Sequence, residues 1–264
     1  MNKAHARLID VEAAAGLIEP LTELVIRAGA AILAVNRSAM KVDGKLDGSP
    51  VTEADLAADR IIGQGLAQLA PDIPSLSEER VQLAKLPYKD SFFLIDPLDG
   101  TKEFVAGRNE FTVNLALVTE GKPLLGIVGR GAERLTLGKG QPRIEPVRSR
   151  VCPPRGQPWA VAVSRSHGDA RTEAFLAARP GAVRCELGSA VKFGRVAEGG
   201  ADIYPRLSPT SEWDVAAGQA VVVAAGGRIT DSRGAALRFG TGRQGFIVPE
   251  FIAWGDPEAA VRAS

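Results

Sequence analysis

Apolar residues at helical spacing dominate the first part of the chain. Over residues 5–35 they recur every three or four positions, which predicts a helix that Pro20 is expected to interrupt or restart. Residues 42–50, VDGKLDGSP, are rich in glycine, aspartate and proline and predict a loop. A second helical pattern covers residues 52–69, and Pro71 is expected to stop it.

Short apolar runs bounded by turn residues predict strands up to residue 129. IPSLSEE (73–79) ends in acids, SFFLID (91–96) is largely apolar, and FTVNLALVTEGKPLLGIVG (111–129) reads as a hairpin around a glycine-containing turn. Residues 138–158 contain five prolines and five basic residues, which predicts a connection between two halves. The predicted halves are residues 1–145 and 146–264.

The second half of the chain contains both helix-like and strand-like patterns of apolar residues. WAVAVS (159–164) and ADIYPRL (201–207) predict strands, while DARTEAFLAA (169–178) and GSAVKFGRVAEGG (188–200) predict helices. WDVAAGQAVVVAAGG (213–227) predicts a helix closed by its two glycines. Strands and helices alternate without strict βαβ repetition, so the pattern favours a layered α/β fold over a Rossmann or TIM plan.

Composition narrows the function classes. The 264 residues carry a net charge of +1, which gives no support to a nucleic-acid polymer as partner. Two cysteines are too few for a disulfide scaffold and suit a reducing compartment. The N-terminus lacks an uninterrupted apolar core of the signal type, and no apolar run is long enough to span a bilayer. We therefore expect a cytoplasmic protein, with peripheral membrane association left open.

The segment DPLDGTKEF follows the predicted strand SFFLI and holds the first candidate chemistry. Asp96 and Asp99 flank Pro97, which fixes its own φ and keeps Asp96 out of the helical region. Both carboxylates and the Leu98 carbonyl can then converge, and Gly100 allows an unusual backbone angle. Mg²⁺ takes such oxygen ligands, so the segment is a candidate metal site; a plain turn is the alternative.

Four other acids each have a structural explanation as well as a functional one. Glu78 and Glu79 follow a predicted strand and match a solvated pair. Asp55 lies in TEAD, where Thr52 and Asp55 match a capping box. Asp214 follows Trp213 at a predicted helix start, where the helix dipole favours an acid.

In combination these segments resemble a known superfamily. SEE (77–79), DPLDGTKEF (96–104) and WDVAAG (213–218) occur in the order typical of the lithium-sensitive, magnesium-dependent phosphomonoesterases, which include inositol monophosphatases and fructose-1,6-bisphosphatases. Inositol monophosphatases usually have DGTTNF where this chain has DGTKEF. The Lys-Glu version is similar to bacterial 3′(2′),5′-bisphosphate nucleotidases of the CysQ type, as are four further stretches: SPVTEAD (49–55), VSRSH (163–167), GSAVKF (188–193) and DIYPRLSPTSEWD (202–214).

The resemblance implies a fold, a reaction and a set of roles. The fold would be the αβαβα sandwich of these enzymes, and the reaction would be removal of the 3′-phosphate of 3′-phosphoadenosine 5′-phosphate by a water activated with two or three Mg²⁺ ions. It leaves a homodimer open. The implied metal ligands are Glu78, Asp96, the Leu98 carbonyl, Asp99 and Asp214. The implied catalytic groups are Asp55, Thr101 and Glu78. The implied substrate contacts are Gly100, Thr101, His167, Ser189, Lys192, Arg206 and Asp214.

Charge chemistry supports part of the implied substrate site. Lys192 and Arg206 can neutralise a second phosphate, Arg206 through a bidentate fork. Ser189 follows Gly188 at a predicted helix N-terminus, a natural anion site. His167 is one of two histidines, and a structural role is its alternative.

Three other functions compete with the nucleotidase. An inositol-phosphate or other sugar-phosphate phosphatase would share the metal site and differ only in its pocket. A haloacid-dehalogenase-type phosphatase needs D-x-D-x-T, whereas these acids are three residues apart. A nucleotide-sensing protein without turnover would not need all the acids. One stretch, RGAERLTLGKGQPRIEPVRSR (130–150), is short, basic and without aromatics where the family usually has a longer, aromatic-rich hairpin.

Overall fold

The structure is a computed structural model that describes residues 8–44, 50–83, 90–130, 149, 157–166, 168–241 and 244–262. Strands and helices alternate irregularly along the chain, with two 3₁₀ helices, η1 and η2, among them. In chain order the elements are α1 (Val11–Ala34), β1 (Val42–Gly44), β2 (Pro50–Thr52), α2 (Glu53–Leu69), β3 (Ser75–Ser77), η1 (Glu78–Leu83), β4 (Ser91–Asp99), α3 (Thr101–Val105), β5 (Thr112–Thr119), β6 (Lys122–Arg130), β7 (Ala160–Ser164), α4 (Ala170–Ala177), β8 (Val183–Leu187), α5 (Val191–Ala197), β9 (Ile203–Arg206), β10 (Thr210–Ser211), α6 (Glu212–Ala224), β11 (Arg228–Thr230), η2 (Gln244–Phe246), β12 (Ile247–Val248), β13 (Phe251–Trp254) and α7 (Pro257–Arg262).

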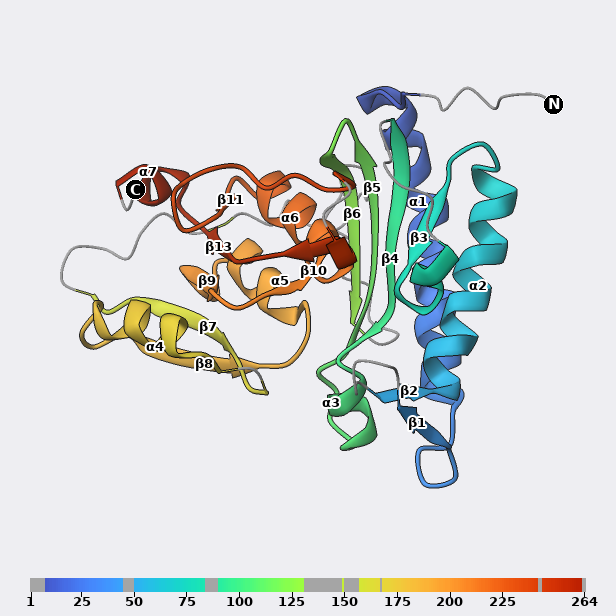
Figure 1. The fold of residues 1–264 in the computed structure, drawn as a ribbon, viewed down its shortest axis with the longest axis horizontal. Coiled ribbons are helices and arrows are strands. Elements are labelled where there is room, and N and C mark those ends of the chain that lie inside the picture. The colour runs from blue at the N-terminus through green and yellow to red at the C-terminus, as the bar shows by residue number, and fades with distance from the viewer. Residues whose placement is uncertain are drawn as a thin grey trace.

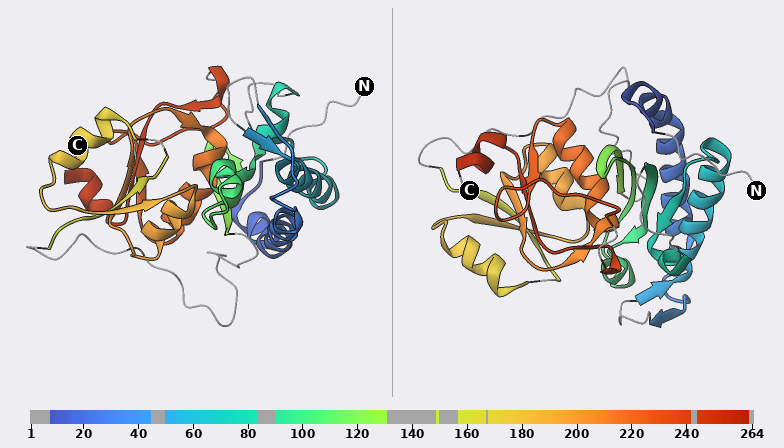
Figure 2. Two further views of the ribbon diagram at one scale, coloured as in Figure 1. Left: turned by 90° about the horizontal axis from the view of Figure 1, so that it is seen from below. Right: turned by 45° about the horizontal axis from the view of Figure 1, so that its top comes forward.

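Two large sheets and three layers of helices stack on one another (Figures 1 and 2), and the pairs β1-β2 and β10-β12 form two small separate sheets. Helices α1 and α2 cover one face of the four-stranded sheet β3-β4-β5-β6, and α6 covers the other. Helices α5 and α6 also pack against the five-stranded sheet β11-β13-β9-β7-β8, whose outer face meets α4 and α7. Hydrophobic clusters fill the interfaces between successive layers. This arrangement confirms the predicted layered αβαβα sandwich.

Helix α1 is continuous, so the expected interruption at Pro20 is wrong. Buried residues on both sides of the proline pack on the same sheet face, and this packing outweighs the one hydrogen bond that proline cannot donate. The helix begins at Val11 rather than near residue 5. Asp10 caps it there, accepting a backbone N–H of the first turn at 2.8 Å.

Other elements differ from the prediction in detail. The predicted loop at 42–50 contains β1 and the start of β2, which pair antiparallel; residues 45–49 lie outside the described residues. The helix predicted over 188–200 is confined to α5, because Ser189 has a φ of +46° that is incompatible with a right-handed helix. Helix α6 ends as predicted, at a left-handed Gly226 with φ of +99°.

A close approach between β6 and α6 ties the two sheets together. A Cβ at Gly126 would lie 2.4 Å from the carbonyl oxygen of Ala217, so glycine lets the helix backbone approach the strand. The cluster between the sheets draws on residues before and after position 145. The division at that position falls outside the described residues and stays a prediction.

None of the described helices combines the length and the apolar character needed to cross a bilayer.

Candidate active site

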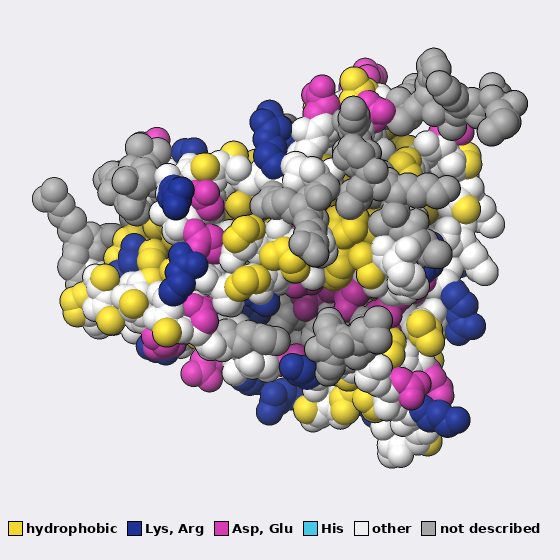
Figure 3. Space-filling model, viewed as in Figure 1, with side chains coloured by type: hydrophobic (Ala, Val, Ile, Leu, Met, Phe, Trp, Pro, Cys, Tyr) yellow, Lys and Arg dark blue, Asp and Glu magenta, His cyan; other side chains and the backbone are white. Residues whose placement is uncertain are grey.

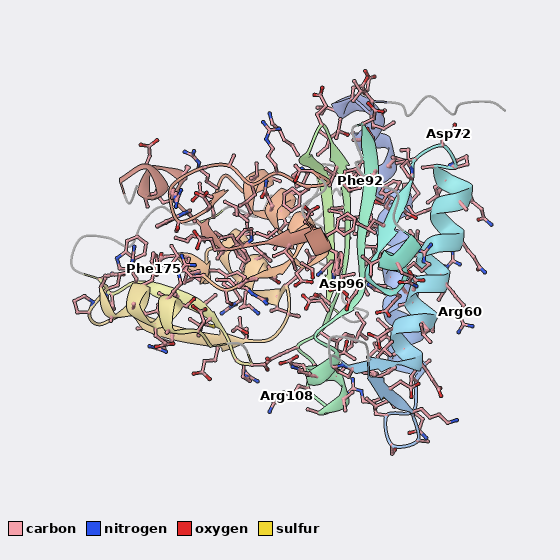
Figure 4. The ribbon with its side chains drawn as sticks, in the orientation of Figure 1. Arg60, Asp72, Phe92, Asp96, Arg108 and Phe175 are labelled. Atoms are coloured by element: carbon pink, nitrogen blue, oxygen red, sulfur yellow. The ribbon has the colours of Figure 1, made fainter. Side chains whose placement is uncertain are left out.

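A cavity of about 330 Å³ opens beside the end of β4, between the first sheet and the C-terminal layers. Figure 3 shows Asp and Glu side chains gathered in a hollow on this face, and Figure 4 shows Asp96 between the four-stranded sheet and the C-terminal half. Most of the predicted site residues line this cavity: Glu78, Asp96, Leu98, Asp99, Gly100, Thr101, Ser189, Lys192, Arg206 and Asp214. Glu79 is not among the residues that line it, and His167 lies outside the described residues.

A bulge in β4 brings Asp96 and Asp99 to one face. Asp96 pairs with Asn114 and Asp99 with Thr112, so the register shifts by one residue between the two pairs. Asn114 and Thr112 are two residues apart on β5 and therefore share a face of the sheet. The extra residue in β4 therefore puts both carboxylates on that same face, whereas in a regular strand two residues three positions apart would point to opposite faces.

Glu78 reaches the same place through parallel pairing. Strand β3 runs parallel to β4, with Ser77 opposite Ile95, so the residues that follow this pair lie side by side. Those residues are Glu78, which follows β3, and Asp96, which lies within β4. The predicted neighbourhood of these two acids therefore follows from the register.

The carboxylate of Asp99 is partly buried and connects three elements. Its Oδ2 accepts hydrogen bonds from the Ala190 backbone N–H at 2.6 Å, from Asn114 Nδ2 at 3.3 Å and from Thr112 Oγ1 at 3.5 Å. Burial, with the charge of Asp214 as a second cause, raises the pKa of Asp99 to about 6. The site thus holds two acids that repel one another when both are ionised.

Asp214 is presented by the first turn of α6. Ser211 caps this helix, and Asp214 at the third helical position completes a capping box. Its Oδ2 accepts the Ser211 backbone N–H at 3.2 Å and the Thr210 hydroxyl. Asp214 thus lies at a helix start, as predicted, and it lines the cavity as well.

Asp55 likewise combines a cap with a contact across the site. Its Oδ2 accepts the backbone N–H and the hydroxyl of Thr52 at 2.8 and 2.6 Å, which forms the predicted capping box. Its Oδ1 accepts the Thr101 hydroxyl at 3.0 Å. That hydroxyl also lies 3.1 Å from the Leu98 carbonyl oxygen. The structure therefore places Asp55 and Thr101, 46 positions apart in sequence, in direct contact.

Two cations, Lys192 and Arg206, also line the cavity. Lys192 is only 3% exposed and is therefore not a solvated surface lysine. Its ammonium donates to the carbonyl oxygens of Ser189 at 2.6 Å and Leu187 at 3.2 Å. Burial lowers the pKa of Lys192 to about 8, although Asp99 opposes this shift. Arg206 donates to Pro209 O at 3.3 Å.

Ser189 is placed differently from the prediction. It was expected at a helix N-terminus, but α5 begins at Val191 with Ala190 as its cap. The left-handed turn at Ser189 points the Ala190 N–H to Asp99 instead. Gly100 is also left-handed, with φ of +92°, as its place after the two acids predicted.

Residues 14–259 match the inositol monophosphatase family. The chain belongs to that family. The 3′(2′),5′-bisphosphate nucleotidase CysQ of Salmonella typhimurium is 41% identical over 242 residues, which cover 89% of this chain and 98% of the relative. The enzyme of the same name from Escherichia coli strain K12 is 40% identical over the same shares. The predicted resemblance to this type is confirmed.

Solved structures agree on the fold. Thermotoga maritima IMPase superposes with a TM-score of 0.74 at 24% identity and covers 94% of this chain and 96% of its own. CysQ from Bacteroides thetaiotaomicron, a bacterial member of the inositol monophosphatase family, gives a TM-score of 0.65 at 29% identity over 89% of this chain and 96% of its own.

Enzymes of this family are metal-dependent, typically with Mg²⁺. Within the described residues, no three Asp, Glu, His or Cys side chains form a group that could hold an ion as they stand. The donor chemistry nevertheless fits a hard cation, because Glu78, Asp96, Asp99, Asp214 and the Leu98 carbonyl offer only oxygen. A cation between Asp99 and Asp214 would also remove the repulsion that raises the pKa of Asp99.

Sequence reasoning missed several polar residues beside the site. Thr112 and Asn114 are buried polar residues two apart in an otherwise apolar strand, and that pattern could have marked them. Glu103 and Glu110 contact the C-terminal half of the cavity wall. No local pattern distinguishes these two from surface acids.

Proposed function

We propose that this protein is a magnesium-dependent, lithium-sensitive 3′(2′),5′-bisphosphate nucleotidase that converts 3′-phosphoadenosine 5′-phosphate to AMP and phosphate. One observation carries the proposal: the acids Glu78, Asp96, Asp99 and Asp214 and the cations Lys192 and Arg206 line a single cavity. A substrate with two phosphates, one held by the acids through metal ions and one by the cations, matches this set of charges. The relatives named CysQ, about 40% identical over most of their length, support the same substrate.

The acids would hold two or three Mg²⁺ ions together with the Leu98 carbonyl. When bound, Mg²⁺ lowers the pKa of an attacking water and neutralises charge on the transferring phosphoryl group. Water would attack the phosphorus in line with the leaving 3′-oxygen, without a phospho-enzyme. As the bond between phosphorus and the 3′-oxygen breaks, that oxygen would keep the electron pair and take a proton from solvent water, which restores the 3′-hydroxyl; the proton of the attacking water returns to solvent later.

Thr101 and Asp55 would take the proton of the attacking water. The Thr101 hydroxyl points its hydrogen toward Asp55 Oδ1 at 3.0 Å, so the lone pairs of Oγ1 can accept a hydrogen bond from the water. As the water attacks, its proton moves to Thr101 Oγ1 and the hydroxyl proton moves to Asp55 Oδ1. Lys192 and Arg206 would bind the 5′-phosphate and Ser189 the nucleoside.

The assay that tests the substrate compares 3′-phosphoadenosine 5′-phosphate with inositol 1-phosphate, with and without lithium. A site built to bind a second charged group discriminates strongly against a substrate that lacks it, so we expect kcat/KM to favour the nucleotide by at least about 100-fold. Lithium should inhibit both reactions. Comparable or reversed rates would assign the protein to the inositol-phosphate or sugar-phosphate phosphatases.

A second test separates an enzyme from a nucleotide-binding protein without turnover. Asp96→Asn keeps the shape of the side chain and removes its charge, so Mg²⁺-dependent phosphate release should be lost while far-UV circular dichroism is unchanged. Addition of Mg²⁺ should raise the melting temperature of the wild type more than that of the variant. Undetectable release from the wild type itself would favour the binding protein.

The proposal includes a cytoplasmic location and a phosphorylated nucleotide as the partner. The proposal leaves a homodimer open, which size-exclusion chromatography with light scattering can test.

A further inference from the structure

Two glutamates that are not among the proposed metal ligands, Glu103 and Glu110, connect the first half of the chain to the C-terminal half beside the cavity. Glu103 lies on α3, directly after the metal-ligand strand, and is 4% exposed. Its Oε1 accepts the Ser166 hydroxyl at 2.6 Å, in the segment that follows β7. In Figure 1, α3 lies beyond the end of β4, apart from the helix layers of the sandwich. Glu103 therefore joins the segment after β4 to a segment more than sixty positions later in the chain.

Glu110 makes a second connection from the same segment. Its Oε2 accepts the Gly188 backbone N–H at 2.9 Å, and its Oε1 forms an ion pair with Arg165 Nη2 at 3.0 Å. Arg165 donates in turn to the Glu186 carbonyl at 2.7 Å, and its backbone N–H donates to Leu187 O at 3.2 Å. The two glutamates thus hold the end of β7 and the turn after β8 at once.

Two glycines let these segments pack closely. We call the contact of Glu103 and Glu110 with the segments around Ser166 and Gly188 the junction. A Cβ at Gly188 would lie 2.7 Å from Glu103 Cγ and 2.8 Å from the Glu110 carbonyl oxygen. A Cβ at Gly100 would lie 3.0 Å from the same carbonyl and 3.2 Å from Ser189 Cβ. The chain around Glu103 and Glu110 is therefore packed directly on the turn that contains Ser189.

The residues held by this junction form the part of the cavity wall beside Lys192. Ser164, Gly188 and Ser189 line it, and Lys192 donates to the carbonyls of Leu187 and Ser189. Burial lowers the pKa of Lys192, and the negative charges of Glu103 and Glu110 act against that shift. The junction thus fixes the turn and also favours the charged form of the lysine within it.

We propose that Glu103 and Glu110 are positioning residues that select the substrate: they set the place of the 187–190 turn and so determine how the part of the substrate beyond the reacting phosphate is bound. This inference rests on the proposed function only in naming that part as a nucleoside 5′-phosphate. The turn meets the acids of β4 where the Ala190 N–H donates to Asp99 Oδ2 at 2.6 Å, so we expect a smaller effect on the reacting phosphate than on the rest of the substrate.

The experiment compares two substrates in four variants, Glu103→Ala, Glu103→Gln, Glu110→Ala and Glu110→Gln. One substrate is 3′-phosphoadenosine 5′-phosphate; the other is p-nitrophenyl phosphate, which has one phosphate and no nucleoside. Glu173→Ala is the matched control, because Glu173 also pairs with an arginine, Arg184, at 2.6 Å but is half-exposed and outside the cavity.

Loss of one charge-assisted hydrogen bond corresponds to about a tenfold change. We therefore expect both alanine variants to raise KM for the nucleotide by about tenfold or more, with kcat/KM for p-nitrophenyl phosphate within about threefold of wild type. Glu103→Gln should restore most of the affinity, since its amide oxygen can accept the Ser166 hydroxyl. Glu110→Gln should fall between, because it can keep Gly188 but not the ion pair. Glu173→Ala should match wild type.

The outcomes separate the alternatives. Equal losses on both substrates, or a melting temperature that falls in parallel with activity, would show that the glutamates are only structural. Unchanged KM in both alanine variants would overturn the inference outright. A wild type that prefers inositol 1-phosphate would refute the proposed nucleotidase function and not the role of the glutamates. The same variants would then be measured with inositol 1-phosphate. A selective rise in KM for that substrate would support the positioning role, and an unchanged KM would refute it.

Discussion

Replacing Thr101 by valine should separate the two contacts of Asp55, which caps α2 and accepts a hydrogen bond from Thr101 behind the cavity wall. Valine has nearly the shape of threonine but no hydroxyl, so the variant removes the 3.0 Å hydrogen bond to Asp55 Oδ1. It leaves intact the capping box, in which Asp55 Oδ2 accepts two hydrogen bonds from Thr52. If capping were the only role of Asp55, activity would not depend on this change.

The expected effects on stability and on rate differ in size. One hydrogen bond to a charged group contributes about 1.5–3 kcal/mol to stability. We therefore expect Thr101→Val to lower the free energy of unfolding by no more than this amount. For a domain of this size that corresponds to a decrease of several degrees in melting temperature, on the order of 2–4 °C per kcal/mol. Loss of a proton acceptor in the reaction costs about 100- to 10,000-fold in kcat. At 1.36 kcal/mol per tenfold, the barrier would rise by about 2.7–5.4 kcal/mol.

The assay measures kcat and KM for 3′-phosphoadenosine 5′-phosphate with saturating Mg²⁺, next to a thermal melt of each protein. Thr101→Ser is the matched control, because serine keeps the hydroxyl and should retain most of the activity. Thr52→Ala removes the cap and should reduce stability by about 0.5–2 kcal/mol with a much smaller effect on kcat than Thr101→Val. A folded Thr101→Val protein with kcat close to wild type would refute the proton path.

Two further predictions concern pH and packing. Because burial lowers the pKa of Lys192 to about 8, kcat/KM for the nucleotide should decrease as pH rises through that value. Lys192→Met should lower kcat/KM and remove this decrease at high pH. A wild-type kcat/KM that stays constant up to pH 9 would contradict a role for the charged lysine in binding the substrate. The sign for stability is opposite: burial of the ammonium costs free energy below about pH 8, and the cost is relieved as pH rises toward the unfolded value of 10.5. Gly126→Ala would put a methyl 2.4 Å from Ala217 O and should destabilise the protein by about 1–3 kcal/mol in urea melts, whereas Gly194→Ala, with no atom within 4 Å of the new methyl, should be neutral or slightly stabilising; equal effects would refute the packing argument.

Elements with strong local signals could be predicted from the sequence. Helix α2 begins after the Thr52 cap, α6 ends at the left-handed Gly226, and β5 and β6 form the expected hairpin. Short edge strands such as β8 and the ribbon of β1 and β2 carry too little hydrophobic alternation to be recognised. The continuation of α1 through Pro20 depends on burial of the helix face, which the local sequence does not contain.

The sequence by itself determined the chemical inventory and the family: which carboxylates follow buried strands, which residues cap helices, and the order of motifs that marks an inositol monophosphatase-family enzyme. Only the tertiary structure decided which side chains meet. Asp96 and Asp99 share a face because β4 bulges against β5, and Asp55 touches Thr101 because two segments of the first half fold together. The physical reason is that residue type and local period are encoded over a few positions. Register, burial and charge proximity arise between segments far apart in the chain, where packing and hydrogen bonding outweigh local preference.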